Sequence, residues 1–192
     1  MIDTENFEKV EVTSVAQLRQ WLEAHHTQQE SIWLVTYKKH IRAQYISTNE
    51  VLDELLCFGW IDGIRRKLDD DRTMQLVGPR RVQHWSQSYK ERAKRLEQEN
   101  RMHPAGLKAI AASKQQGLWN YLDDVDALEI PADLVAALTI YPGAMEQFAA
   151  YAPSYRRNVL RWVKLAKTST TREKRIQKVV DTTLQNQKIP QM

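Results

Sequence analysis

The sequence predicts an α+β fold, in which a small antiparallel sheet with flanking helices is followed by an all-helical C-terminal unit. Residues 32–37 are a run of β-branched and aromatic residues typical of a strand, and residues 8–12 form a shorter strand candidate. Residues 60–68 and 73–77 are also strand-like and are joined by a polar tip, which indicates a β-hairpin. After about residue 86 the apolar residues recur at helical spacing almost to the end of the chain.

Two helices are expected between these strands. Ser14 and Gln17 have the spacing of a capping box, in which two side chains satisfy free amides at a helix start. Ser47 and Glu50 repeat the pattern before a second apolar helix. Gly59 is placed to end that helix, because the left-handed position after a helix favours glycine.

The second half of the chain carries a series of helix-start signals. Ser88 and Glu91, and later Thr170 and Glu173, have capping-box spacing. Residues 145–151 predict a further short helix. Three prolines suit the first turn of other helices: Pro104, Pro131 and Pro153.

The best candidate for a domain boundary is the acidic stretch at residues 123–126. Before it lies the mixed α+β unit, predicted to span residues 1–122, and after it the helical unit, residues 123–192. The pattern leaves open whether these units are two independent domains or one folded body.

The composition excludes several classes of protein. The chain has 192 residues, of which 42% are hydrophobic and 27% charged, as expected for a globular protein. Cys57 is the single cysteine, so an internal disulfide is impossible. The sequence contains no membrane-span candidate of about 20 apolar residues, and its polar, acidic start differs from a signal peptide. We therefore expect a cytoplasmic protein.

Charge is distributed in alternating blocks along the chain. The formal balance is −5 over residues 1–62, +5 over 63–101, −4 over 102–153 and +8 over 154–192. The basic blocks either attract anions or nucleic acid or pair with the acidic blocks inside one folded body. The sequence leaves both interpretations open.

Motifs for catalysis, metal binding and nucleotide binding are absent from the sequence. No two of the five histidines are four residues apart, and neither HExxH nor a paired-cysteine motif occurs, so we expect no metal site. The GxSxG, GxxxxGK[ST] and GxGxxG patterns are also missing. We therefore expect no cofactor and favour a protein that is not an enzyme.

The segment of residues 57–92 combines glycine, proline, tryptophan and arginine at predicted chain breaks. Its glycines indicate tight backbone geometry, and two successive arginines after Pro79 can present planar forks to a carboxylate or phosphate. A tryptophan can stack on a flat ligand or on an arginine. The predicted binding site for a small anionic or aromatic ligand consists of Trp60, Asp62, Arg80, Arg81 and Trp85.

Each member of this predicted site has a role and an alternative. In the binding hypothesis Trp60 and Trp85 stack on the ligand, Arg80 and Arg81 recognise its charge, and Asp62 orients it or acts as a weak general base. In the alternative, Asp62 pairs with one of the two arginines and both tryptophans fill the core.

A second functional hypothesis is nucleic-acid binding by two basic C-terminal helices, whose lysines and arginines would neutralise phosphates. A third is a protein-interaction module, for which the sequence predicts no oligomeric state. The basic residues of the nucleic-acid hypothesis are Arg157, Arg161, Lys164, Lys174, Arg175 and Lys178.

Several of these motifs occur in an order typical of one protein family. They are CFGWIDG at residues 57–63, PRR at 79–81 and WS at 85–86, followed by PADL at 131–134 and AK at 166–167. On these motifs the chain resembles the bacteriocin-protection, YdeI/OmpD-associated family over about residues 30–188. The resemblance implies a helical C-terminal module, a link to bacteriocin tolerance and stress, and no established reaction.

Overall fold

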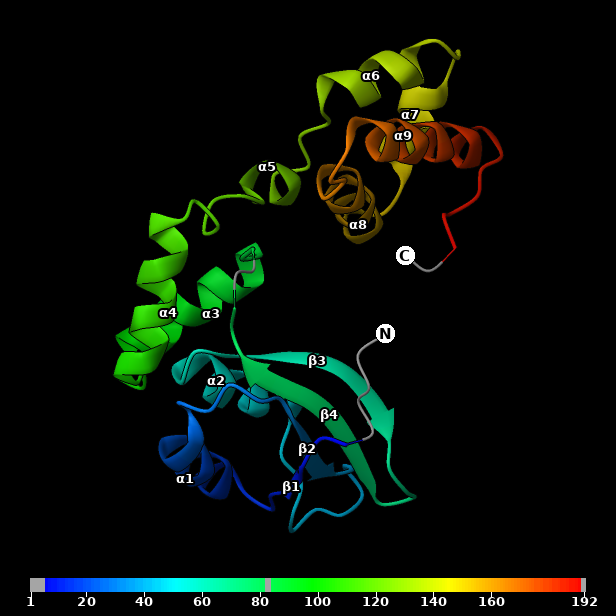
Figure 1. The fold of residues 1–192 in the computed structure, drawn as a ribbon. Helices are drawn as coiled ribbons and strands as arrows, with labels where there is room; N and C mark the ends of the chain where they lie inside the picture. Colours follow the sequence, from blue (N-terminus) through cyan, green and yellow to red (C-terminus); the bar gives the residue numbers. More distant parts are fainter. Residues whose placement is uncertain (1–5, 82–83, 191–192) are drawn as a thin grey trace. The chain divides into compact units, whose positions relative to one another are not determined.

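The computed structural model describes residues 6–81 and 84–190, and the chain divides into two compact units (Figure 1). The N-terminal unit comprises residues 1–120 and the C-terminal unit residues 121–192. The division lies two residues before the predicted boundary. The N-terminal unit contains a sheet and helices and the C-terminal unit only helices among its described residues, which confirms the α+β fold class.

The strands and helices of the N-terminal unit alternate in its first part. Their order is β1 (Lys9–Glu11), α1 (Val15–His25), β2 (Ile32–Tyr37), α2 (Thr48–Cys57), β3 (Trp60–Lys67), β4 (Arg72–Pro79), α3 (Gln87–Gln98) and α4 (Pro104–Gln115). All four strands coincide with the predicted strand segments.

The four strands form one sheet in the order β1-β2-β4-β3. β4 is antiparallel to both β2 and β3, with Ile32 opposite Val77, but β1 pairs with β2 in parallel. The sheet is therefore mixed, and the prediction of an antiparallel sheet is correct for three of its strands. The parallel pairing follows from α1, which carries the chain across between β1 and β2.

Local caps define the first two helices as predicted. The Ser14 hydroxyl accepts a hydrogen bond from the amide of Gln17, at 3.2 Å. Ser47 and Glu50 form a complete capping box at the start of α2. Gly59 follows α2 with φ +74°, the left-handed conformation that a side chain would strain.

The two later capping boxes are wrong in position. Helix α3 begins after Ser86, whose hydroxyl contacts that of Ser88 instead of a backbone amide. Helix α9 begins after Thr168, which accepts a hydrogen bond from the amide of Thr171 at 3.1 Å. In both segments neighbouring Ser or Thr residues offer alternative caps, and tertiary packing selects among them.

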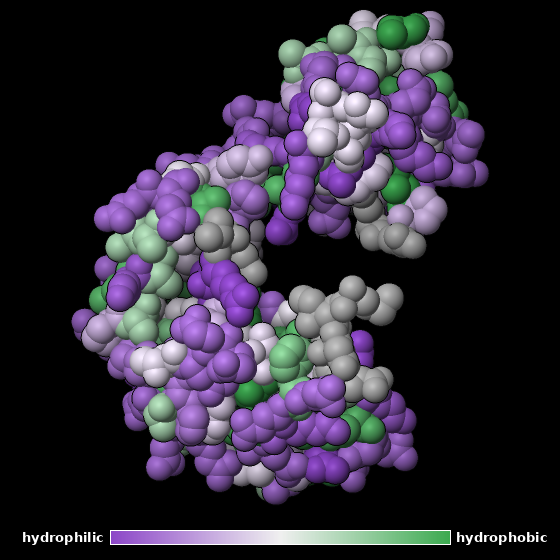
Figure 2. All heavy atoms as spheres, in the orientation of Figure 1, coloured by the Kyte–Doolittle hydropathy of each residue, from purple (hydrophilic) through white to green (hydrophobic). Residues whose placement is uncertain are grey.

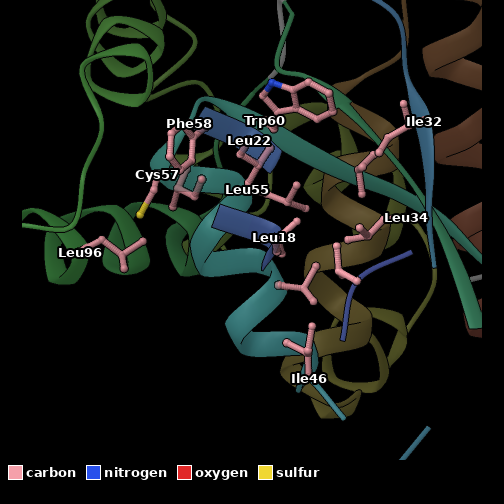
Figure 3. Close-up of a cluster of buried hydrophobic side chains, with 14 of the residues drawn as sticks. Leu18, Leu22, Ile32, Leu34, Ile46, Leu55, Cys57, Phe58, Trp60 and Leu96 are labelled. Atoms are coloured by element: carbon pink, nitrogen blue, oxygen red, sulfur yellow. The ribbon is translucent and has the colours of Figure 1, made fainter. Parts of the chain in front are cut away.

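One face of the sheet packs against helices α1 and α2 (Figure 3). Leu18 and Leu22 of α1 meet Ile32 and Leu34 of β2 in this core. Cys57 lies at the end of α2 with no exposed surface, and burial raises the pKa of its thiol to about 11.

Helix α2 also carries two buried acidic residues. Glu54, 2% exposed, bonds Arg19 at 2.9 Å and Arg101 at 2.7 Å. Asp53, 6% exposed, bonds Arg95 through both carboxylate oxygens at 2.7 Å, and it also contacts Arg92. We call this group of residues 19, 53, 54, 92, 95 and 101 the buried charge cluster. It connects α1, α2 and α3.

Helix α4 approaches the end of α2 closely at Gly106. A Cβ atom at Gly106 would lie 2.3 Å from the carbonyl oxygen of Cys57 and 2.8 Å from that of Leu56. Because these are backbone atoms, only glycine fits at this contact. His103 caps α4 by accepting a hydrogen bond from the amide of Ala105 at its Nδ1, at 3.2 Å.

The C-terminal unit is built from five helices within its described residues. They are α5 (Asp123–Asp126), α6 (Ala132–Thr139), α7 (Ala144–Ala150), α8 (Pro153–Lys164) and α9 (Ser169–Leu184). Leu134, Leu138 and Phe148 form the centre of its core, each with no exposed surface. None of the helices described in either unit is long and apolar enough to cross a membrane.

Candidate ligand-binding site

The two arginines after β4 enter different surroundings. The amide of Arg80 donates to the carbonyl oxygen of Gly59 at 2.8 Å, which extends the pairing of β4 with the start of β3. Successive side chains of an extended segment point to opposite sides. Accordingly Arg80 contacts the rings of Trp85, just before α3, and Tyr89, in its first turn, while Arg81 lines a pocket.

The pocket beside Arg81 has a volume of about 550 Å³. Phe7, Ile61 and Leu76 contribute apolar lining, and all three are half-buried. Arg81 itself is exposed and donates from Nη2 to the carbonyl oxygen of Gln29 at 3.1 Å. Polar residues of the same lining include Glu30, Ser31 and Asp62.

The Asp62 carboxylate belongs to a hydrogen-bonded network. Its Oδ2 accepts from Gln75 at 3.0 Å, and its Oδ1 accepts from the hydroxyl of Tyr89. Gln75 in turn accepts from Arg65 at 2.6 Å. Burial, together with the bond to Asp62, raises the pKa of Tyr89 well above its usual range. Asp62 thus orients protein side chains, and its predicted direct pairing with an arginine is replaced by bonds to Gln75 and Tyr89.

The Arg80 guanidinium is stacked against aromatic side chains. It lies 3.8 Å from the ring centre of Trp85 and 5.1 Å from that of Tyr89. Burial lowers the pKa of Arg80 to about 10, although Tyr89 and Asp62 oppose the shift. This is the Trp–Arg stacking that the sequence offered as one role for Trp85.

Both predicted site tryptophans belong to the core. Trp60 is 1% exposed and lies in the cluster of buried side chains (Figure 3). It donates from its indole nitrogen to the carbonyl oxygen of His26 at 3.3 Å, and its ring meets the Trp21 ring edge-on. Trp85 has no exposed surface. Of the five predicted residues, Asp62 and Arg81 line the pocket beside Arg81, whereas Trp60, Arg80 and Trp85 are not part of its lining.

The residues of the nucleic-acid hypothesis are partly engaged within the C-terminal unit. Lys164 bonds both carboxylate oxygens of Asp124, at 2.6 and 2.7 Å. The Arg175 guanidinium lies 5.1 Å from the ring centre of Trp162 and bonds the carbonyl oxygen of that residue. The visible face of the unit is mostly hydrophilic (Figure 2).

The other basic residues of that hypothesis are more accessible. Arg157 is half-buried, and three side chains are exposed: Arg161, Lys174 and Lys178. Two of the six basic residues, Lys164 and Arg175, thus form hydrogen bonds within the unit. Fewer of the six are available to bind phosphates than the sequence suggests.

Sequence reasoning missed Gln75 and Tyr89. Gln75 is 7% exposed and occupies a position of β4 that faces the same side as the core residue Val77. A polar residue at an inward strand position indicates a buried hydrogen bond, but Gln75 lies between Met74 and Leu76, so the sequence alone does not mark it as inward. Tyr89 carries no local signal either, since its role depends on how α3 packs against the sheet.

The fold and pocket define a two-part protein, an α+β unit with a small-molecule-sized pocket followed by a helical module. Residues 10–109, more than half of the chain, match a family described as a domain of unknown function, DUF8412, and the chain belongs to it. Residues 127–186 match the family described as bacteriocin-protection, YdeI or OmpD-associated. This match confirms the predicted resemblance within the C-terminal unit, while the GWIDG and PRR motifs fall within the DUF8412 match. No curated protein and no solved structure matches the chain.

Proposed function

We propose that this protein binds a small organic anion in the pocket beside β4, with Arg81 recognising the acidic group. The observation that carries the proposal is an accessible pocket of about 550 Å³ that combines this cation with apolar lining. Pockets for small ligands usually measure about 300–1,000 Å³ and combine apolar walls with a few polar groups. Phe7, Ile61 and Leu76 would contact the apolar body of the ligand.

The chemistry of the lining favours a singly charged ligand. A guanidinium has five N–H donors, and among the described contacts Arg81 gives one of them to Gln29. The remaining donors suit a carboxylate, which accepts two parallel hydrogen bonds. Glu30 lies in the same lining and would repel a polyanion. We therefore expect aryl or alkyl monocarboxylates to bind better than citrate.

We infer binding rather than catalysis at this pocket. Both oxygens of Asp62, the predicted weak base, already accept hydrogen bonds from Gln75 and Tyr89. The match of the C-terminal unit to the bacteriocin-protection family supports a physiological context of stress tolerance. In that context the protein would sense or sequester a small acid.

Isothermal titration calorimetry with benzoate, phenylpropionate and citrate tests the proposal. Arg81→Ala is expected to weaken monocarboxylate binding about tenfold or more, because a charged hydrogen bond contributes about 1.5–3 kcal/mol. Arg42→Ala is the matched control, since it removes an exposed arginine that is not part of the pocket lining. Equal affinities in the wild type and Arg81→Ala, or no binding of any monocarboxylate at millimolar concentration, would contradict the proposal.

A further inference from the structure

The two outer strands of the sheet, β1 and β3, differ in how their free edges are protected (Figure 1). Outer strands are usually kept from pairing with another chain by a bulge, a proline or charged side chains. The register of β3 is irregular between Asp62 and Arg65, and residues 65–67 are three consecutive exposed cations. The described pairing of β1 shows no such irregularity, and its residues, Lys9, Val10 and Glu11, carry one charge of each sign.

The backbone of β1 directs alternate residues to β2 and to the free edge. The carbonyl oxygen of Glu8 accepts a hydrogen bond from a β2 amide at 2.8 Å, and the amide of Val12 donates to a β2 carbonyl at 3.2 Å. The even-numbered residues of this segment therefore pair with β2, as the parallel register requires. The amides and carbonyls of Lys9 and Glu11 consequently face the free edge, where no described residue bonds them.

A second copy of β1 in antiparallel orientation matches this edge. When the Val10 residues of the two copies lie opposite each other, Lys9 of each copy lies opposite Glu11 of the other, and a two-fold axis relates the two pairs. Residues directly opposite each other in such a pair exchange both of their backbone hydrogen bonds. Their side chains lie on the same face of the sheet, and opposite charges in this position stabilise the pairing.

Glu11 remains an accessible acid for this contact. Its carboxylate accepts hydrogen bonds from the Tyr37 hydroxyl and from Arg72, both at 2.5 Å, and the bond from Tyr37 lowers the pKa of Glu11. Arg72 also bonds Asp69 at 2.8 Å, so one arginine serves two acids. The Glu11 side chain is 40% exposed. It is therefore ionised at neutral pH and can accept a further bond from a lysine.

A groove between β1 and α1 provides an apolar surface beside the same edge. Its volume is about 420 Å³, and Val10 and Val12 line it on the β1 side. The α1 side of the lining contains no aspartate, glutamate, lysine or arginine, although 27% of the chain is charged: it consists of Gln17, Gln20, Trp21, Ala24 and His25. The two-fold axis that pairs the strands places both α1 helices on one face of the joined sheet, where these uncharged surfaces meet.

We propose that this protein forms a two-fold symmetric dimer, in which the β1 edges of two copies pair in antiparallel orientation and join their sheets. The match of Lys9 with Glu11 favours a second copy over an unrelated extended segment, which would supply the backbone groups but not both charges. The dimer does not depend on ligand binding beside Arg81, because that pocket and the groove beside β1 share no lining residue.

Sedimentation equilibrium of the full chain tests the dimer directly. The average mass of the wild type should rise with protein concentration from that of one chain toward that of two. Lys9→Pro removes an outward amide but no bond to β2, and proline is tolerated at such edge positions. This variant should keep its circular dichroism spectrum and dimerise at least about tenfold more weakly. A wild type that stays monomeric at millimolar concentration, or equal dimerisation of Lys9→Pro, would overturn the proposal.

Lys9→Glu and Glu11→Lys test the orientation of the two strands. Each variant alone places like charges opposite each other in both pairs, so its dimerisation should be about tenfold weaker than that of the wild type. An equimolar mixture restores opposite charges in both pairs and should dimerise more tightly than either variant alone. Lys108→Glu, the same charge change at an exposed position of α4, is the control and should behave as the wild type. A mixture that dimerises no better than the separate variants would overturn the proposal.

Val10→Cys gives a covalent readout of the same register. In the proposed pairing the Cα atoms of the two copies of residue 10 lie about 4.5 Å apart, which is within the range of a disulfide. Mild oxidation should therefore link two copies of this variant, as seen by mass on a non-reducing gel. The wild type is the control, since Cys57 has no exposed surface. Failure to link at concentrations where the wild type dimerises would overturn the proposal.

Discussion

The two units stabilise themselves with ion pairs of similar geometry but different burial. In the N-terminal unit the Glu54 side chain is 2% exposed and bonds two arginines. In the C-terminal unit Asp133 bonds Arg172 at 2.6 Å, yet the two side chains are 45% and 29% exposed. Exposed pairs contribute little to stability, whereas removing one partner of a buried pair leaves a charge without compensation. Ion pairs with similar distances are therefore expected to contribute different amounts to stability, because their burial differs.

The largest expected effect is the loss of an acid from the buried charge cluster. Glu54→Ala should lower the free energy of unfolding of the N-terminal unit by about 3 kcal/mol, because the charged hydrogen bonds from Arg19 and Arg101 to one buried carboxylate are both lost. Asp133→Ala, the corresponding change in the C-terminal unit, should cost under about 1 kcal/mol. Urea denaturation followed by fluorescence measures both, since Trp162 reports on the C-terminal unit and the other five tryptophans on the N-terminal unit. If the two substitutions lowered the free energy of unfolding by similar amounts, the expected difference between the buried and the exposed ion pair would be wrong.

The contact between α2 and α4 provides the next effect. Gly106→Ala should destabilise the N-terminal unit by about 3 kcal/mol, because the added Cβ overlaps two backbone carbonyl oxygens that cannot easily move. Gly143→Ala in the C-terminal unit is the control. No atom lies within 4 Å of the added Cβ there, so only the positive φ of +79° is penalised, by about 1–2 kcal/mol. A smaller loss for Gly106→Ala than for Gly143→Ala, measured by urea denaturation, would contradict the packing argument.

The smallest expected effect is a difference in pH dependence between the units. All five histidines lie in the N-terminal unit. Burial lowers the pKa of His103 below 6.5, helped by His26 and Arg19 and opposed by Glu23. The unfolded chain therefore binds this proton more readily than the folded one. The stabilisation is fully present above about pH 6.5 and is lost as the pH falls through 6.5 toward the folded pKa.

Unfolding midpoints measured between pH 7.5 and 5 check this expectation. The midpoint of the N-terminal unit should fall with acidification more steeply in the wild type than in His103→Asn. Asparagine is a good N-cap, so the variant keeps a cap for α4 and removes the titrating group. Identical slopes in the two proteins would show that His103 does not carry the effect.

The parts of the fold that the sequence predicted are those set by local patterns. The strand segments, the capping box of Ser47 and Glu50 and the left-handed Gly59 each depend on residues within a few positions of one another. The parallel pairing of β1 depends on how α1 crosses the sheet. The choice of Ser86 over Ser88 as the cap of α3 depends on how that helix packs. Neither is encoded in the spacing of residues.

The candidate site follows the same division. The sequence placed the two arginines after Pro79 in one predicted site with Trp85, whereas in the structure Arg80 stacks on Trp85 and Arg81 lines the pocket. Their separation onto opposite sides of the chain depends on the pairing of Arg80 with Gly59, which is 21 positions away in the sequence. Trp60 is a different case. The nearby glycines suggested that its side chain is presented to a ligand, whereas in the structure this side chain is buried in the core.

The lone cysteine has a practical consequence for all of these measurements. The Cys57 thiol is fully buried and its pKa of about 11 leaves little thiolate at neutral pH, so alkylating reagents should reach it only when the end of α2 opens. The rate at which Cys57 is labelled would then report how often the N-terminal unit opens. This measurement works under native conditions and needs no introduced probe. The single cysteine thus allows local opening of the N-terminal unit to be measured directly by mass spectrometry.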